Sequence, residues 1–217
     1  MDPKRYLIIG YGRFGRLAAR RLRLYDPECA IILVERDGAK LKDTLPPHVT
    51  VFNEDALSFL IGSGQVESTD IIIPMVPFHL AASFIVSSVK GCGEMLYPRE
   101  LDALLPNPFP LNRNVICCGR ADFVCPDDCP EGDLCTVTGL PRKPLYDDLE
   151  GIEIPGFTTV VQRSSQILPG VGGYPVHDLQ RLTRLIRPGK YLAATSCKCH
   201  GVVTALLCRS SPEEPAA

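Results

Sequence analysis

The sequence predicts an α/β protein, with a doubly wound parallel sheet in its first half and a smaller, cysteine-rich α+β region after it. Three observations lead to this fold class. Short apolar runs alternate with helical patterns over the first hundred residues, as in parallel strands joined by right-handed crossovers. Three prolines within residues 106–110 interrupt this alternation. Most of the ten cysteines follow that point, so the composition changes there.

The expected strands of the first half are apolar runs rich in β-branched residues, which is typical of strands buried on both faces. They lie at residues 6–9, 30–34, 49–52, 71–73 and 94–97. Apolar positions at helical spacing predict the helices of this half at residues 14–25, 56–61 and 78–89. In the second half we expect a helix at residues 176–186 and strands at residues 191–195 and 202–207.

Charge and hydropathy exclude several classes of partner. With 23 basic and 25 acidic residues the net charge is -2, so no basic footprint predicts a nucleic-acid partner. The longest apolar stretch, residues 71–89, contains prolines, a histidine and serines, which indicates a buried strand, a turn and a helix rather than a membrane span. The sequence shows no signal peptide. We therefore expect a cytoplasmic protein with reduced cysteines.

Residues 10–15 read Gly-Tyr-Gly-Arg-Phe-Gly and stand between the first expected strand and the first expected helix. This context indicates a Rossmann dinucleotide-binding loop. Gly10 would permit the tight turn, Gly12 would let the backbone approach a pyrophosphate, and Gly15 would let the helix pack on the strand. Arg13 is a candidate phosphate contact, and Phe14 lies in the same loop. The alternative is a glycine-rich turn that binds no dinucleotide.

Glu35 ends the second expected strand, twenty residues after Gly15. A carboxylate there accepts hydrogen bonds from the ribose hydroxyls of the adenosine, which favours NAD(H) over NADP(H). Arg36, the next residue, leaves room for a 2'-phosphate. These residues complete the candidate nucleotide site.

Residues 7–16, Leu-Ile-Ile-Gly-Tyr-Gly-Arg-Phe-Gly-Arg, resemble the start of the N-terminal domain of TrkA/RCK proteins, the nucleotide-sensing subunits of potassium transporters and channels. Residues 53–56, Asn-Glu-Asp-Ala, resemble that family's Gly-Asp-Ala segment, whose aspartate lies near the adenosine. The resemblance covers residues 5–90 and implies that Asp55 is a second nucleotide-side residue.

Five cysteines lie between residues 117 and 135, and a Cys-Lys-Cys-His group lies at residues 197–200. Crowded thiols in a reducing compartment favour soft metals. The candidate ligands are Cys117, Cys118, Cys125, Cys129, Cys135, Cys197, Cys199 and His200. Cysteine followed by proline, at residues 125–126 and 129–130, resembles ferredoxin-type loops and favours an iron–sulfur cluster. Zinc is the alternative, and redox-active or buried thiols remain open. Cys29, Cys92 and Cys208 are expected in the core.

The prolines and these motifs divide the chain into a dinucleotide-binding domain at residues 1–110, a cysteine-rich metal or iron–sulfur region at 111–209 and a disordered tail at 210–217. We expect an NAD(H)-binding protein with a cysteine-ligated metal and a redox or redox-sensing role. One alternative is a nucleotide-sensing regulatory subunit of potassium transport, and another is a protein with a purely structural zinc site.

The sequence names no substrate, and an NAD-linked oxidoreductase is the enzyme class that it allows. The expected partners are the dinucleotide and a protein, which would be a redox partner or a membrane transporter subunit. A homodimer is an assembly that the sequence leaves open.

Overall fold

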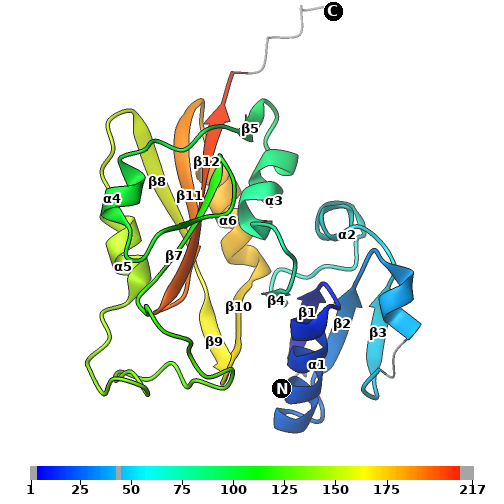
Figure 1. The fold of residues 1–217 in the computed structure, drawn as a ribbon. Helices are drawn as coiled ribbons and strands as arrows, with labels where there is room; N and C mark the ends of the chain where they lie inside the picture. Colours follow the sequence, from blue (N-terminus) through cyan, green and yellow to red (C-terminus); the bar gives the residue numbers. More distant parts are fainter. Residues whose placement is uncertain (1–3, 43–44, 211–217) are drawn as a thin grey trace, which may run out of the picture. The chain divides into compact units, whose positions relative to one another are not determined.

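The computed structural model describes residues 4–42 and 45–210 (Figure 1). In this part the chain is a mixed α/β protein with six α-helices and two mixed sheets of six strands each. The chain forms two compact units. Unit 1 contains the chain up to Leu80 with Val124–Arg142 and Ser164–Gln180, and unit 2 contains Ala81–Phe123, Lys143–Arg163 and the chain from Arg181 onward. Residue 110, the predicted boundary, lies within a segment of unit 2, and residues 211–217 of the predicted tail lie outside the described residues.

The sheet of unit 1 has the strand order β3-β2-β1-β4-β10-β9. Its strands are β1 (Arg5–Ile9), β2 (Ala30–Val34), β3 (Val49–Phe52), β4 (Ile71–Pro74), β9 (Ser165–Leu168) and β10 (Val171–Pro175). The first four are parallel, and each agrees with a predicted strand to within one residue. β10 pairs with β4 and β9 pairs with β10 in antiparallel fashion, so the sheet is mixed rather than wholly parallel.

The helical elements of unit 1 are α1 (Arg13–Tyr25), the 3-10 helix η1 (Gly38–Lys42) and α2 (Ala56–Gly62). α1 places Ala18 and Leu22 against Ile8 and Ile31 of the sheet, as its predicted apolar spacing requires. α2 packs on β3, because the ring centroids of Phe52 and Phe59 lie 4.8 Å apart. Both predicted helices of this unit are confirmed.

The sheet of unit 2 has the order β6-β7-β12-β11-β8, with β5 paired to β12. Its strands are β5 (Cys92–Glu94), β6 (Phe109–Pro110), β7 (Val115–Gly119), β8 (Phe157–Arg163), β11 (Gly189–Ser196) and β12 (His200–Cys208). Among the described strands of this sheet, β11 and β8 pair in parallel and the other neighbours pair in antiparallel fashion. The prediction of a strand at 94–97 in the first sheet is wrong, because the strand of this region is β5, which spans residues 92–94 and belongs to the second sheet.

Helices cover both faces of this second sheet (Figure 1). They are α3 (Leu80–Ser88), α4 (Leu101–Leu104), α5 (Leu145–Glu150) and α6 (Val176–Leu185), and α6 belongs to unit 2 from Arg181 onward. Side chains alternate along a strand, so Leu192 of β11 packs with α4 and α5 while Tyr191 packs with α3 and α6. Unit 2 is therefore a three-layer α/β/α structure.

The apolar stretch at residues 71–89 forms β4, a turn and α3, as predicted. Within residues 4–42 and 45–210, the helices are all too short or too polar to span a bilayer.

Candidate functional site

The glycine loop at residues 10–15 connects β1 to α1, and its first and third glycines are required by packing. Gly10 has φ +101°, and an ideal Cβ there would lie 2.5 Å from the carbonyl oxygen of Met75. An ideal Cβ on Gly15 would lie 2.1 Å from the carbonyl oxygen of Gly10. Both distances are far below van der Waals contact, so these two positions exclude every other residue unless the backbone moves.

Gly12 differs from its neighbours. It adopts an extended conformation with φ -73° that any residue can take, and apart from Gly12 and its two chain neighbours, no heavy atom of the described residues lies within 4 Å of an ideal Cβ there. The fold of the loop therefore does not require glycine at this position. Open space over a backbone at the start of a helix is what a pyrophosphate needs for close approach.

The first turn of α1 begins at Arg13 and contains no acidic residue. The Arg13 guanidinium lies 5.6 Å from the centroid of the Phe14 ring, and its Nη2 lies 3.9 Å from Oδ2 of Asp127. The side chains of Arg13 and Asp127 are both exposed. The positive end of the helix dipole and an exposed arginine thus occur together at the loop, as an anion site requires.

Glu35 directly follows β2, and its buried carboxylate braces the glycine loop. Oε2 accepts a hydrogen bond from the Tyr11 amide at 2.7 Å. Oε1 accepts one from the Asp37 amide at 2.8 Å and lies 3.5 Å from the Lys40 ammonium. Burial acts to raise the pKa of Glu35, but the two amides and the Lys40 charge outweigh it, so the pKa lies below its ordinary value.

This lowered pKa predicts a pH dependence of stability. A carboxyl whose pKa is depressed in the folded state stabilises the fold above its unfolded pKa and loses that contribution as the pH falls through the folded pKa. We expect Glu35→Gln to be destabilised relative to the wild type above about pH 4.5, and the difference to shrink at lower pH. Urea unfolding at a series of pH values measures it. The exposed Glu28, changed to Gln, is the matched control, and equal profiles for both variants would contradict the prediction.

The other predicted nucleotide-side residues have different surroundings. Asp55 caps α2, since its Oδ1 accepts the amides of Leu57 at 2.9 Å and Ser58 at 3.2 Å. Arg36 is exposed. Asn53, which was not among the predicted site residues, donates from its Nδ2 to the carbonyl oxygens of Glu35 at 2.8 Å and Arg36 at 2.9 Å. Asn53 thereby fixes the turn after β2, and its position just after β3 was the available signal.

The candidate metal ligands fall into two groups. Cys125, Cys129 and Cys135 belong to unit 1, whereas the 117–118 and 197–200 groups belong to unit 2. Over residues 4–42 and 45–210, no three His, Cys, Asp or Glu side chains are arranged as a ready metal-binding group.

In unit 2, strand pairing brings the two sequence-distant groups together. Cys118 pairs with Gly201 across β7 and β12, and an ideal Cβ on Gly201 would lie 3.2 Å from Cys118 Sγ. Cys197 Sγ accepts the amides of Cys199 at 3.4 Å and His200 at 3.3 Å, and it lies 3.8 Å from His200 Nδ1. Burial, more than the neighbouring charges, raises the pKa of Cys118 to about 12.

In unit 1, the thiols lie in the Val124–Arg142 segment. Cys129 Sγ lies 3.2 Å from Thr136 Oγ1 and accepts a hydrogen bond from Arg142 Nη2 at 3.3 Å. Hydrogen bonds from the side chain and amide of Thr138, with smaller contributions from Val137 and Arg142, lower the pKa of Cys135 to about 7. Arg142 was not singled out from the sequence.

The three cysteines expected in the core differ from one another. Cys29 is a buried free thiol in unit 1. Cys92 and Cys208 pack in the core of unit 2 but are joined by a disulfide, so the expectation of reduced cysteines does not hold for this pair. They are directly opposed on β5 and β12.

Comparison with known proteins gives the chain a family. An uncharacterized protein from Archaeoglobus fulgidus is 27% identical over 219 residues, covering 92% of this chain and 98% of that protein. No solved structure matches the chain. The assignment to the TrkA/RCK family is wrong, because the family that matches is a different one and begins at residue 78, wholly beyond the glycine loop. The likeness of residues 7–16 and 53–56 to that family misled, since glycines at the spacing of this loop are shared by dinucleotide-binding strand–loop–helix units in general. Residues 78–209, more than half of the chain, match the family AF_1314_C, described as "Uncharacterized protein, C-terminal domain", and the chain belongs to this family.

Proposed function

We propose that the protein binds NAD(H) at the glycine loop of unit 1, which on this view is a Rossmann-type unit. The observation that carries the proposal is the contrast among the three glycines. Gly10 and Gly15 are packed against backbone, while the space over Gly12 is open within the described structure. Packing explains two of the glycines, and a ligand that must approach the backbone closely explains the third.

The strand order supports this proposal. The parallel strands run β3-β2-β1-β4, so the chain leaves β1 toward β2 on one side and later adds β4 on the other. In open α/β sheets, ligands bind at the carboxyl ends of the strands where the order reverses. The loop after β1 and the turn after β4 meet there, because Gly10 packs against Met75. Glu35 and Asn53 follow β2 and β3 at the same edge.

The role that we infer for the nucleotide is redox chemistry or redox sensing together with a cysteine-ligated metal. The crowded thiols of both units favour soft metals, either as an iron–sulfur cluster or as zinc. A purely structural zinc site is the second candidate. The backbone amides of Cys199 and His200 donate to Cys197 Sγ, and such hydrogen bonds orient a sulfur ligand toward a metal. A cytoplasmic location and a protein redox partner accompany the first candidate.

Titration of the protein with NADH and NADPH tests the nucleotide proposal. We expect NADH to bind more tightly, because the Glu35 carboxylate repels a 2'-phosphate and accepts hydroxyl hydrogen bonds. Gly12→Ala should weaken NADH binding at least about tenfold, since the methyl group occupies the space of the pyrophosphate. Isothermal calorimetry gives both affinities. A Gly12→Ala protein that binds NADH as the wild type does would overturn the assignment of the loop.

A further inference from the structure

We propose that Cys125, Cys129 and Cys135 alone form a thiolate site for one soft metal ion of the zinc class. The inference rests on the proposed function, because it assigns the metal part of that function to one segment of unit 1. The remaining candidate ligands, in unit 2, are then not part of this site.

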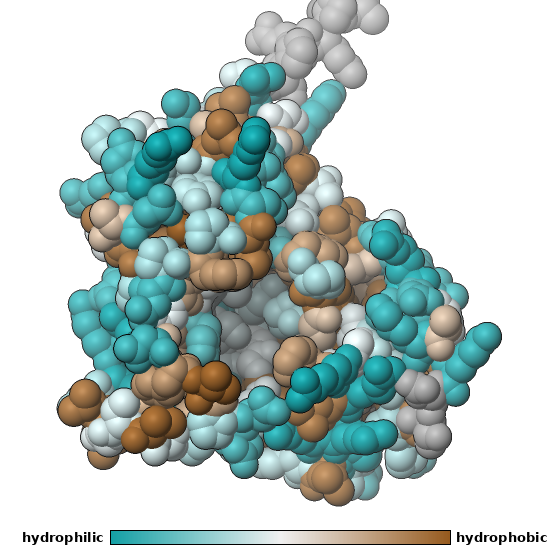
Figure 2. Space-filling model, viewed as in Figure 1, coloured by the Kyte–Doolittle hydropathy of each residue, from teal (hydrophilic) through white to brown (hydrophobic). Residues whose placement is uncertain are grey.

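The Val124–Arg142 segment is folded by backbone hydrogen bonds rather than by an apolar core. The Cys135 amide donates to the Leu140 carbonyl and the Arg142 amide to the Asp133 carbonyl, each at 2.8 Å. Its four largest exposed apolar side chains, Val124, Leu134, Val137 and Leu140, are each more than half exposed. Figure 2 shows apolar residues at the lower left, where this segment lies in Figure 1. Small folded pieces that bury little apolar surface are commonly stabilised by disulfides or by a bound metal.

Turns within the segment bring the thiols near one another. Cys129 lies against Thr136, the neighbour of Cys135, and Cys125 precedes Cys129 by a single turn, in which the Cys129 amide donates to the Pro126 carbonyl at 3.1 Å. All three are free and partly exposed. Because they are not yet grouped around one point, metal binding must draw the sulfurs together.

The electrostatic balance fits a single divalent ion. Three thiolates around a divalent cation leave one negative charge, and the Arg142 guanidinium already donates to Cys129 Sγ. Three thiols are fewer than the four cysteines that common iron–sulfur clusters take. They leave the fourth tetrahedral position open, as zinc sites with a chemical role do.

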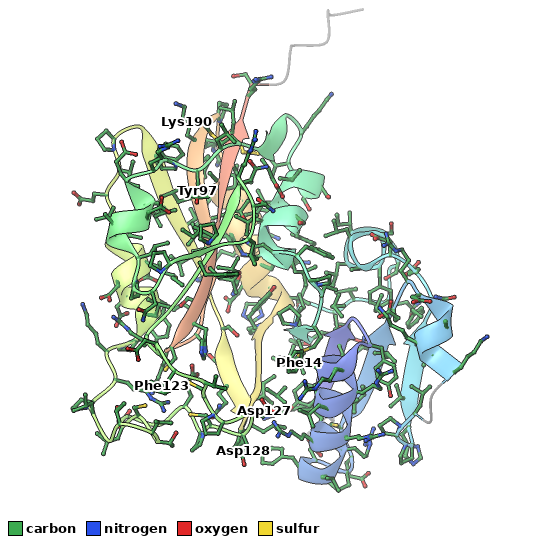
Figure 3. All side chains as sticks on the ribbon, viewed as in Figure 1. Phe14, Tyr97, Phe123, Asp127, Asp128 and Lys190 are labelled. Carbon is green, nitrogen blue, oxygen red and sulfur yellow. A yellow bond between two sulfur atoms is a disulfide. The ribbon has the colours of Figure 1, made fainter. Side chains whose placement is uncertain are left out.

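The segment is also fastened to the nucleotide-loop side of unit 1. Asp127, between Cys125 and Cys129, accepts a hydrogen bond on its carbonyl from Arg21 Nη1 of α1 at 2.8 Å. Figure 3 shows Asp127 beside α1. Gln166 of β9 holds the other side, because it bonds the Cys129 carbonyl and the Glu131 amide, each at 2.8 Å. The proposed metal site and the glycine loop thus share one compact unit.

Anaerobic titration with Cd²⁺ tests the proposal, because thiolate-to-cadmium charge transfer gives an absorption band that counts bound sulfurs. We expect the Cys125→Ser, Cys129→Ser, Cys135→Ser triple variant to lose one equivalent of bound Cd²⁺ relative to the wild type. The matched control changes Cys117, Cys118, Cys197 and Cys199 to Ser and should retain that equivalent. A triple variant that binds as much Cd²⁺ as the wild type would overturn the site.

A second measurement uses the wild-type protein alone, so a folding defect in a variant cannot affect its result. Zn²⁺ should protect the three thiols of the segment from alkylation in the full-length wild-type protein, mapped by mass spectrometry of peptides. Unchanged alkylation of Cys125, Cys129 and Cys135 would also overturn the proposal. NADH binding, measured separately on metal-free protein, distinguishes failure of this site from failure of the nucleotide proposal.

Discussion

Gly15→Ala is expected to destabilise the protein by about 3 kcal/mol or more, the upper part of the range for forced overpacking. The added methyl carbon would lie 2.1 Å from the Gly10 carbonyl oxygen, which is backbone and cannot rotate away. Alanine is normally favoured over glycine inside a helix by about 1 kcal/mol. The collision is the larger effect, so the usual preference is reversed at this position.

Gly12→Ala is the matched control for this prediction, since it makes the same chemical change three residues earlier in open space. Its free energy of unfolding should stay within about 0.5 kcal/mol of the wild type. Urea unfolding followed by circular dichroism compares the two variants. Equal free energies of unfolding for Gly15→Ala and Gly12→Ala would contradict the close contact between Gly15 and the Gly10 carbonyl.

Cys208→Ser is expected to lower the free energy of unfolding by about 4 to 5 kcal/mol, from the entropy of loop closure. The disulfide joins Cys92 and Cys208, which are 116 residues apart in sequence, and a cross-link that closes a long loop restricts the unfolded chain most. The lost bond also places a serine hydroxyl in the core of unit 2, where Cys208 is 3% exposed.

Chemical reduction gives an independent measure of the same bond. Wild-type protein unfolded in dithiothreitol should lose most of the stability that Cys208→Ser loses, and the variant itself should respond little to the reductant. Cys29→Ser is the control, because Cys29 is a buried free thiol and its variant should stay sensitive to reduction. A wild-type protein whose stability is the same with and without dithiothreitol would contradict the prediction.

The parts of the fold that the sequence predicted are those set by local pattern. β1 to β4 are apolar runs and α1 has a strong apolar stripe, so their bounds follow from adjacent residues. β10 could not be recognised from its sequence, Val-Gly-Gly-Tyr-Pro, because two glycines and a proline are unusual in a strand. The need for glycine at position 173 is explained only by β4, which is distant in the sequence. An ideal Cβ on Gly173 would lie 2.4 Å from the Ile72 carbonyl oxygen of β4. β7 was read as part of a cysteine cluster, although Val-Ile-Cys-Cys-Gly is an apolar run.

The candidate site shows the same limit. The glycine loop and Glu35 lie at fixed spacing in one strand–loop–helix–strand segment, so a pattern could identify them. Asn53, Arg142 and Gln166 act through hydrogen bonds to residues that reach them only in the folded chain. The sequence predicted the eight metal ligands as a single list. They are divided between the two units because the chain returns to unit 1 at residues 124–142, which the sequence does not reveal.

That re-entry has a consequence for biosynthesis and for dissection of the protein. The four parallel strands of unit 1 are complete by Pro74, yet their partner β10 is made about a hundred residues later. A nascent chain therefore carries β4 as an exposed apolar edge until β10 has been synthesised, and such edges invite aggregation. A fragment limited to residues 78–209, the matched region, retains β9 and β10 as a two-stranded ribbon without the sheet that they extend, which is marginally stable at best. A piece that keeps both sheets whole must extend from β1, which begins at Arg5, to β12, which ends at Cys208.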